Sequence, residues 1–276
     1  MLNYEKTYAE SIKNPEIFWE NIAKELSWYK PWNKVLDWKY PYARWFVDGQ
    51  TNIVYNALDR WMNTDIKNKT ALIWVAQPFD SAQGKDLSER KFTYKQLNDE
   101  VSKFANGLKS LGVKKGDKIT IYLPRIPEQF IAMLACLKIG AVHSVVYSGF
   151  SADALKNRIE DAQAKIVICS NSYPYGKKII DSKKNVDEAL KENKTVEHVI
   201  VVNRINNDTN DANFYANDTN IRIKYIKWND LVAKQSSVCL TEMMESSDPA
   251  FILYTSGTTG KPKGIIHGHG GYMVGI

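Results

Sequence analysis

The stretch that decides the fold is 118-KITIYLPRIPEQFIAMLACLKIGAVHSVVYSGFSADALKNRIEDAQAKIVIC-169. Short apolar runs rich in β-branched residues alternate in it with segments of helical spacing, and a further run follows downstream. The runs are 118–123, 142–147, 165–169 and 198–202, and the helical segments between them begin near Pro127, Ser151 and Asp181. This alternation is typical of a parallel sheet with crossover helices on its faces. We therefore predict an α/β fold, a doubly wound and largely parallel sheet with flanking helices.

Upstream of this stretch, the sequence predicts a strand, a turn and a long helix. Residues 71–76 are apolar and predict a strand, and residues 80–90 predict a polar turn. Thr93 is expected to cap the next helix with Gln96 as its reciprocal partner, and Gly112 is expected to end it. The apolar face of that helix is formed by Leu97, Val101, Phe104, Ala105, Leu108 and Leu111.

Downstream, residues 203–220 are rich in Asn and Asp and predict a surface excursion. Residues 224–232 predict a strand followed by a short helix that begins at Asn229. Residues 249–254 predict a strong strand that leads directly into a polar loop.

Six of the eight tryptophans lie in residues 1–62, which show two short helical patterns between turns. We predict that this segment wraps a larger body and fills its surface grooves with aromatic side chains. The expected organisation is a wrapping segment over 1–62 and a larger α/β domain over 63–276.

The composition argues against a membrane, secreted, nucleic-acid-binding or metal-binding protein. With 276 residues, 44% hydrophobic and 25% charged, the chain can bury a sizeable core. It shows no apolar span of membrane length and no signal peptide, so a cytoplasmic location without membrane association is expected. The net charge is +6, but the lysines are scattered, and we expect no nucleic-acid partner. The three cysteines are expected to be buried free thiols, and no metal-ligand spacing is present.

The polar loop is TSGTTGKPKG, residues 255–264. Its glycines allow a ligand close to the backbone, and its hydroxyls, amides and lysines suit an anion with many oxygens, such as a polyphosphate. It does not match the spacings GxxxxGK[ST] or GxGxxG. The alternative reading is an ordinary hydrophilic hairpin loop.

This loop resembles the phosphate loop of the adenylate-forming enzymes, a superfamily of acyl-CoA synthetases, luciferases and adenylation domains. Within it the chain is similar to the AMP-forming acetyl-CoA synthetases and their short-chain relatives. The stretches that carry this likeness are 31-PWNKVLDW-38, 42-YARWFVDGQTNIVYNALDR-60, 122-YLPRIPEQFIAMLACLKIGAVHSVV-146, 150-FSADALKNRIEDAQAK-165 and 267-HGHGGY-272.

The resemblance implies a two-step ligation with ATP, Mg²⁺ and coenzyme A. ATP and acetate or another short-chain acid would give an acyl-adenylate and pyrophosphate, and the coenzyme A thiol would then displace AMP. The loop would hold the outer phosphates during in-line attack on the α-phosphate. The residues expected to bind them are Thr255, Ser256, Gly257, Thr258, Thr259, Gly260, Lys261 and Lys263. No catalytic residue and no metal ligand is expected within these 276 residues.

Two segments resemble the coenzyme A contacts of the family. The turn 146-VYSGFS-151 has Ser148 where a glycine is usual, and Tyr147, Ser148 and Gly149 are expected to lie against the pantetheine. The segment 172-SYPYGKKI-179 offers Lys177 and Lys178 to the 3′-phosphate, with Pro174 where an arginine is expected. Lys177 is either a phosphate ligand or an exposed loop lysine.

The sequence favours structural roles for His143, His267, His269 and Arg60. His143 is expected to be a core residue satisfied by hydrogen bonds. His267 and His269 could approach the ligand, but packing is favoured, and Arg60 is expected to be structural. A helix is expected to begin at Gly271.

Family members are more than twice as long, so we expect an N-terminal portion that is inactive alone and leaves apolar strand edges open. The alternatives are a non-catalytic nucleotide-binding module, half of a split enzyme with a separately encoded C-terminal part, and a decayed remnant.

Overall fold

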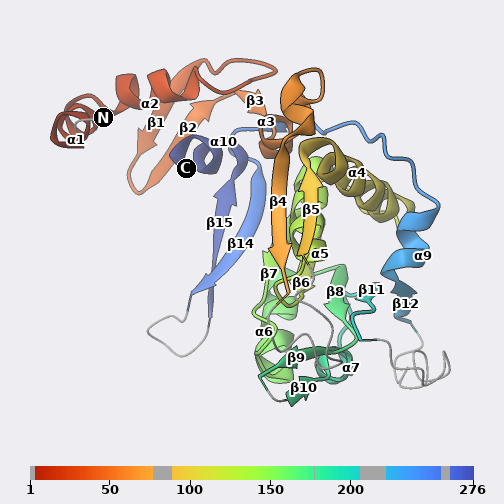
Figure 1. Cartoon of the computed structure of the whole chain (residues 1–276). Helices are drawn as coiled ribbons and strands as arrows, with labels where there is room; N and C mark the ends of the chain where they lie inside the picture. Colours follow the sequence, from red (N-terminus) through yellow and green to blue (C-terminus); the bar gives the residue numbers. More distant parts are fainter. Residues whose placement is uncertain (1–3, 77–88, 177, 206–221, 256–261) are drawn as a thin grey trace.

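The computed structural model describes residues 4–76, 89–176, 178–205, 222–255 and 262–276. Its centre is a seven-stranded sheet with the order β12-β11-β8-β6-β7-β14-β15 (Figure 1). Every neighbouring pair is parallel except β14 and β15, which are antiparallel. The strands are β6 (Lys118–Tyr122), β7 (Val142–Val145), β8 (Ile166–Ser170), β11 (His198–Val202), β12 (Lys224–Lys227), β14 (Pro249–Thr255) and β15 (Lys263–Gly268). The predicted strands and the doubly wound α/β class are therefore confirmed.

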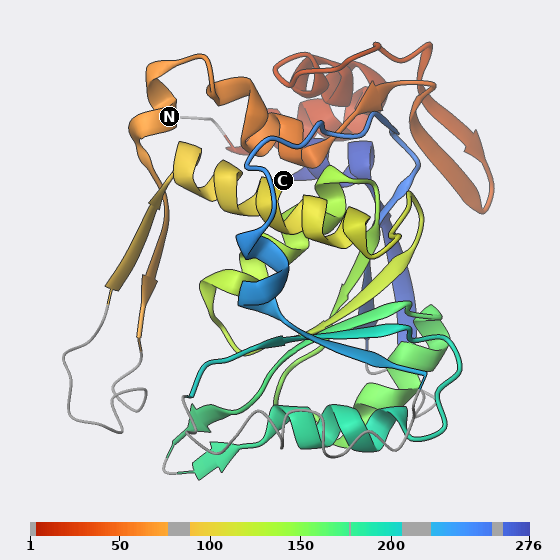
Figure 2. The same cartoon turned by 90° about the vertical axis from the view of Figure 1, so that its right-hand side faces the viewer.

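Helices cover both faces of this sheet (Figure 2). On one face, α4 (Tyr94–Ser110), α5 (Pro127–Lys138) and α9 (Trp228–Ala233) share a core with the strands, and Phe104 stacks on Trp228 at 3.7 Å between ring centroids. On the other face, α6 (Ala152–Ala162) and α7 (Ser182–Leu190) cover a second core. α9 begins at Trp228, one position before the predicted Asn229.

The long helix α4 has the predicted cap. The Thr93 hydroxyl accepts from the Gln96 N–H, and the Gln96 side chain accepts from the Thr93 N–H, so both parts of the capping box are present. Gly112 follows the helix with a φ of +81°, which glycine adopts at little cost. The predicted apolar face is buried up to Leu108, and Leu111 is partly exposed.

A separate antiparallel hairpin stands beside the main sheet. It consists of β4 (Thr70–Val75) and β5 (Glu89–Thr93). The predicted strand is confirmed as β4, but Glu89 and Arg90, predicted as part of the turn, are in β5. The rest of the predicted turn, apart from these two residues, lies outside the described residues, as does most of the predicted surface excursion over 203–220.

The N-terminal segment contains more structure than the two predicted helical patterns. Its elements are α1 (Tyr4–Lys13), α2 (Pro15–Ala23), the hairpin β1 (Lys34–Lys39) and β2 (Tyr42–Val47), then β3 (Gln50–Thr51), α3 (Ile53–Ala57), η1 (Asp59–Trp61) and η2 (Asp65–Asn68). β3 pairs with β13 (Met244–Glu245). The hairpin was missed because its strands mix charged and aromatic residues, and cross-strand pairing decides them.

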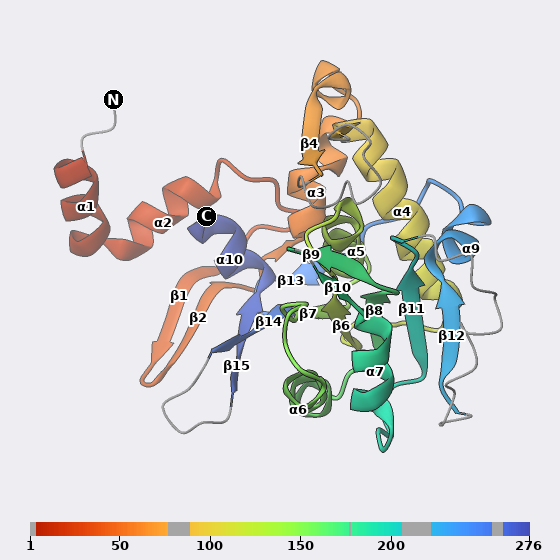
Figure 3. The same ribbon diagram turned by 60° about the horizontal axis from the view of Figure 1, so that its bottom comes forward.

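The N-terminal aromatic residues pack mainly on one another, not into separate grooves. Trp28 and Trp32 lie 5.4 Å and 5.1 Å from the Phe46 ring, respectively, measured between centroids. This cluster also contacts Val274 of α10 (His269–Gly275), so the N-terminal segment lies against the C-terminal helix (Figures 1 and 3). Trp38 is 61% exposed.

The polar loop is followed by a strand, not directly by a helix. β15 pairs with β14 and precedes α10, which begins at His269 and not at the predicted Gly271. Sequence reasoning missed β15 because two of its six residues are glycines and it directly follows a polar loop, so its pairing with β14 decides its strand structure. β15 is the last strand of the sheet, and Ile265 and Ile266 on it are 48% and 62% exposed.

All three cysteines are free thiols. Cys136 and Cys169 are buried, and burial raises the pKa of both thiols, whereas Cys239 is only partly buried, contrary to prediction. None of the helices in the described ranges combines the length and apolar composition that crossing a bilayer requires.

Candidate functional site

The order of the strands creates a crevice at the carboxyl edge of the sheet. After β6 the chain passes through α5 to β7 on one side, and after β8 it passes through α7 to β11 on the other side. Because α5 and α7 cover opposite faces, the loops that leave the neighbouring strands β6 and β8 separate. Such a switch point is where open α/β sheets bind their ligands.

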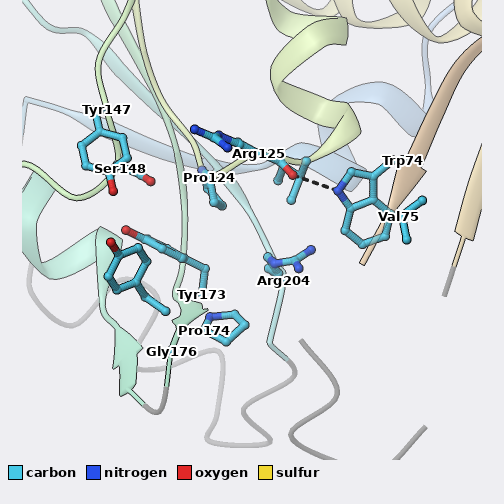
Figure 4. A pocket seen from close by; sticks show the side chains of 12 residues that line it. Trp74, Val75, Pro124, Arg125, Tyr147, Ser148, Tyr173, Pro174, Gly176 and Arg204 are labelled. Atoms are coloured by element: carbon cyan, nitrogen blue, oxygen red, sulfur yellow. Dashed lines mark hydrogen bonds between the residues drawn. The ribbon is translucent and has the colours of Figure 1, made fainter. Parts of the chain in front are cut away.

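A pocket of about 510 Å³ occupies this position (Figure 4). Segments that follow four adjacent strands line it, together with the end of β4. The lining residues are Trp74 and Val75 of β4, Pro124, Arg125 and Ile126 after β6, Tyr147 and Ser148 after β7, Tyr173, Pro174, Tyr175 and Gly176 after β8, and Arg204 after β11. Its volume is within the usual range for a small-molecule site.

The structure brings together the two segments predicted to contact coenzyme A. Tyr147 and Ser148 line the same pocket as Tyr173 and Tyr175. The interaction with Tyr175 raises the pKa of Tyr147, and burial raises the pKa of Tyr173. Ser148 is 5% exposed. The serine that replaces a glycine is therefore buried at the pocket that the turn after β7 shares with β9 (Tyr173–Tyr175).

Gly149 shapes this turn without lining the pocket. A Cβ atom there would lie 2.5 Å from Cε1 of Tyr147, so a larger residue would displace the Tyr147 ring. The Tyr122 hydroxyl donates to the main-chain oxygen of Phe150 at 2.7 Å, which fixes the next residue of the turn. Ser151 then caps α6, because its hydroxyl accepts from the Ala154 N–H.

The predicted lysine contacts are only partly described. β9 and β10 (Lys178–Ile180) form an antiparallel hairpin, with Gly176 at a φ of +59° in its turn. Lys177 lies outside the described residues. Lys178 is exposed and is not among the residues that line the pocket.

The predicted phosphate loop begins at the same edge of the sheet as the pocket. β14 is parallel to β7, so Thr255 lies at its carboxyl end, and Thr255 is the register partner of Lys263 in β15. Both residues are exposed. The flanks of the loop thus form a hairpin, as the alternative reading anticipated. Ser256, Gly257, Thr258, Thr259, Gly260 and Lys261 lie outside the described residues.

The histidines near the loop pack into the fold. His143 is buried and stacks on Phe251, which stacks on His267 on its other side with ring centroids 4.6 Å apart. Burial lowers the pKa of His143 to about 3. The prediction of a core residue is confirmed, but Nδ1 of His143 has no hydrogen-bond partner among the described residues, so the expectation that it is satisfied is wrong.

His269 is fully buried at the start of α10. Its Nδ1 accepts from the Ile53 N–H at 3.5 Å, and burial lowers its pKa to about 4. Arg60 is structural as predicted, since Nη1 donates to Asn56 Oδ1 at 3.2 Å and the guanidinium lies 4.2 Å from the Trp61 ring centroid.

Sequence reasoning missed the six lining residues outside the two predicted segments, namely Trp74, Val75, Pro124, Arg125, Ile126 and Arg204. A signal existed for Arg125, because it follows a predicted strand closely and the carboxyl edge of a parallel sheet is where ligands bind. Trp74 lies on a separate hairpin, and only tertiary packing places it here.

The fold and the crevice define the class: an α/β protein with a pocket at the switch point of a parallel sheet. The chain belongs to the AMP-binding enzyme family, whose model matches residues 58–275. A second model, described as acetyl-coenzyme A synthetase N-terminus, matches residues 4–57. The family expected from the motifs is thus confirmed.

Relatives of known function match almost the whole chain. It is 45% identical over 278 residues to an acetyl-coenzyme A synthetase of Deinococcus radiodurans, covering 99% of this chain and 39% of the relative. It is 43% identical to a 3-hydroxypropionyl-coenzyme A synthetase of Metallosphaera sedula, covering 96% and 38%. The structure of an acetoacetyl-CoA synthetase from Streptomyces lividans superposes with a TM-score of 0.84 at 26% identity, covering 100% and 40%. The chain thus spans about two fifths of the length of these relatives.

Proposed function

We propose that this chain supplies ATP- and coenzyme-A-binding parts of a cytoplasmic AMP-forming ligase. The reaction would join acetate or another short-chain carboxylate to coenzyme A through an acyl-adenylate. Residues 63–276 would carry the nucleotide site, and residues 1–62 would wrap it. The observation that carries the proposal is the switch-point pocket, which unites the turn at Tyr147 and Ser148 with the hairpin at Tyr173–Tyr175.

In this proposal the chain positions substrates and supplies no covalent chemistry. Loop residues from Thr255 to Lys263 would hold the outer phosphates of ATP while charge develops on the departing pyrophosphate. Mg²⁺ would neutralise part of that charge, and no residue of this chain is assigned to it as a ligand. The pocket would hold coenzyme A, whose thiol attacks the acyl carbon as AMP leaves.

Calorimetric titration of the 276-residue chain with ATP and with coenzyme A tests the proposal. We expect both to bind, and we expect Lys261→Ala to weaken ATP binding and leave coenzyme A binding unchanged. A matched change at an exposed helix position, Lys109→Ala, should affect neither. Absence of ATP binding, or equal ATP binding by both variants, would contradict the assignment of the loop.

A second candidate is that the chain works together with a separate polypeptide that corresponds to the remaining length of the relatives. The exposed apolar residues on β14 and β15 favour it: Leu253 is 46% exposed, and Ile265 and Ile266 lie on the edge strand. Alone, the chain is expected to bind nucleotide without turnover. Mixing it with the remaining part of a relative should then restore acetate-dependent release of pyrophosphate. Turnover by the chain alone near that of a full-length relative would refute the expectation.

A further inference from the structure

Two guanidinium groups line the switch-point pocket from different strands of the sheet. Arg125 follows β6 and is exposed, and Arg204 follows β11 and is partly buried. No carboxylate in the described part of the chain lies within ion-pair distance of Arg125. The pKa of Tyr147 is raised mainly by Tyr175, and the nearby charge of Arg125 opposes that rise only weakly.

Trp74 connects the segments that carry these two arginines. Its indole N–H donates to the main-chain oxygen of Arg125 at 2.8 Å, and the guanidinium of Arg204 lies 5.3 Å from a ring centroid of Trp74 (Figure 4). Tertiary contacts therefore hold the backbone of Arg125, while its exposed side chain is available to a ligand. Arg204 is already engaged with the indole face, so we expect Arg125 to make the stronger contribution.

The rest of the lining suits an anionic ligand that also has an apolar or flat part. None of the described residues that line the pocket is acidic, and several carry hydroxyls or aromatic rings. The volume of about 510 Å³ exceeds the needs of a single phosphate ion. A guanidinium in such a site can donate two parallel hydrogen bonds to a phosphate, which a lysine ammonium cannot do.

We propose that Arg125, assisted by Arg204, binds a phosphate group of coenzyme A in the switch-point pocket and discriminates the coenzyme from its unphosphorylated pantetheine portion. The identity of the ligand rests on the proposed function. The assignment of Arg125 as the anion-binding residue rests on the geometry of the pocket.

Calorimetric titrations with coenzyme A, dephospho-coenzyme A and pantetheine test this proposal. For Arg125→Gln we expect about tenfold to a hundredfold weaker binding of coenzyme A, the usual effect of losing charge-assisted hydrogen bonds, and unchanged binding of pantetheine. Arg44→Gln removes the same charge on the distant strand β2 and should leave both affinities unchanged. Arg125→Lys should give an intermediate loss, and circular dichroism should show the wild-type fold for each variant.

The three ligands identify which phosphate is bound. A loss with coenzyme A that disappears with dephospho-coenzyme A assigns Arg125 to the 3′-phosphate, and a loss that persists assigns it to the diphosphate. Both results support the proposal. Equal affinity of wild type and Arg125→Gln for coenzyme A overturns it, and so does an absence of coenzyme A binding by the wild type at millimolar concentration.

ATP binding, measured on the same samples, distinguishes a failure of the Arg125 inference from a failure of the proposed function. If ATP binds but Arg125→Gln has no effect on coenzyme A, the inference fails and the proposed assignment of the loop stands. If coenzyme A binding depends on Arg125 but ATP does not bind, the inference stands and that assignment fails.

Discussion

Two buried histidines should make the folded chain sensitive to mild acid. His143 on β7 and His269 on α10 are 3% and 0% exposed, respectively. Burial lowers both pKa values from 6.5, that of His143 to about 3 and that of His269 to about 4. Secondary effects come from charges around them: His269 further lowers the pKa of His143, while Asp248 raises and Lys115 lowers that of His269.

Stability falls as the pH falls, because the unfolded chain binds protons more readily than the folded chain. Above pH 6.5 both rings are neutral in the folded and the unfolded chain, so full stability is present. Below that pH the unfolded chain takes up protons that the folded chain cannot, and stability falls until the folded pKa values near 3 and 4 are reached. Each pH unit costs about 1.4 kcal/mol per ring. At about pH 5 the loss is therefore about 2 kcal/mol for each histidine and about 4 kcal/mol for the pair.

Urea unfolding followed by circular dichroism at about pH 7.5 and about pH 5 measures this loss. In His143→Gln the pH-dependent loss should be smaller than in the wild type by about 2 kcal/mol, since one ring no longer titrates. His267→Gln is the matched control, because His267 stacks on the other side of the same Phe251 ring and is only partly buried. Comparison of the variants cancels the carboxylates, which titrate in all of them. Equal pH dependence in wild type and His143→Gln would refute the reasoning.

Three further changes test the fold and the pocket. Thr93→Ala removes the cap of α4 and should lower the free energy of unfolding by about 1 kcal/mol in urea titrations; an unchanged midpoint would argue against the cap. The Lys138 side chain is 1% exposed, and its Nζ lies 2.7 Å from Oδ1 of Asp59. Asp59→Ala leaves this ammonium group buried without its charge partner and should lower the free energy of unfolding by about 3 kcal/mol in the same assay. A loss below about 1 kcal/mol would show that Lys138 reaches water. Gly149→Ala should displace the Tyr147 ring and weaken coenzyme A binding in calorimetry without lowering the melting temperature; wild-type affinity would remove Tyr147 from the site.

Local patterns in the sequence predict much of the sheet and its helices. The runs at 118–123, 142–147, 165–169 and 198–202 became strands because continuous β-branched residues suit a sheet buried on both faces. The start of α4 at Thr93 and its end near Gly112 were predictable because a capping box and a terminal glycine act within a few residues. The family was also evident from the sequence, since TSGTTGKPKG and the matching stretches are contiguous.

Elements whose partners are distant in the sequence could not be predicted in the same way. The hairpin of β1 and β2 and the edge strand β15 have weak local patterns, and cross-strand contacts order them. Nδ1 of His143 has no hydrogen-bond partner among the described residues, and this could not be predicted either. The burial of a ring and the lack of a partner near it depend on neighbouring strands.

The sequence by itself determined the α/β class, the approximate strands, the helix cap and the family of this chain. Tertiary structure alone decided that β8 returns to the opposite side of β6 from β7, and this order opens the crevice between their loops. It also placed Trp74, Arg125 and Arg204 around one pocket with the turn at Tyr147. The physical reason is that local patterns act over a few residues, whereas strand order and the convergence of side chains on a ligand depend on packing between distant segments.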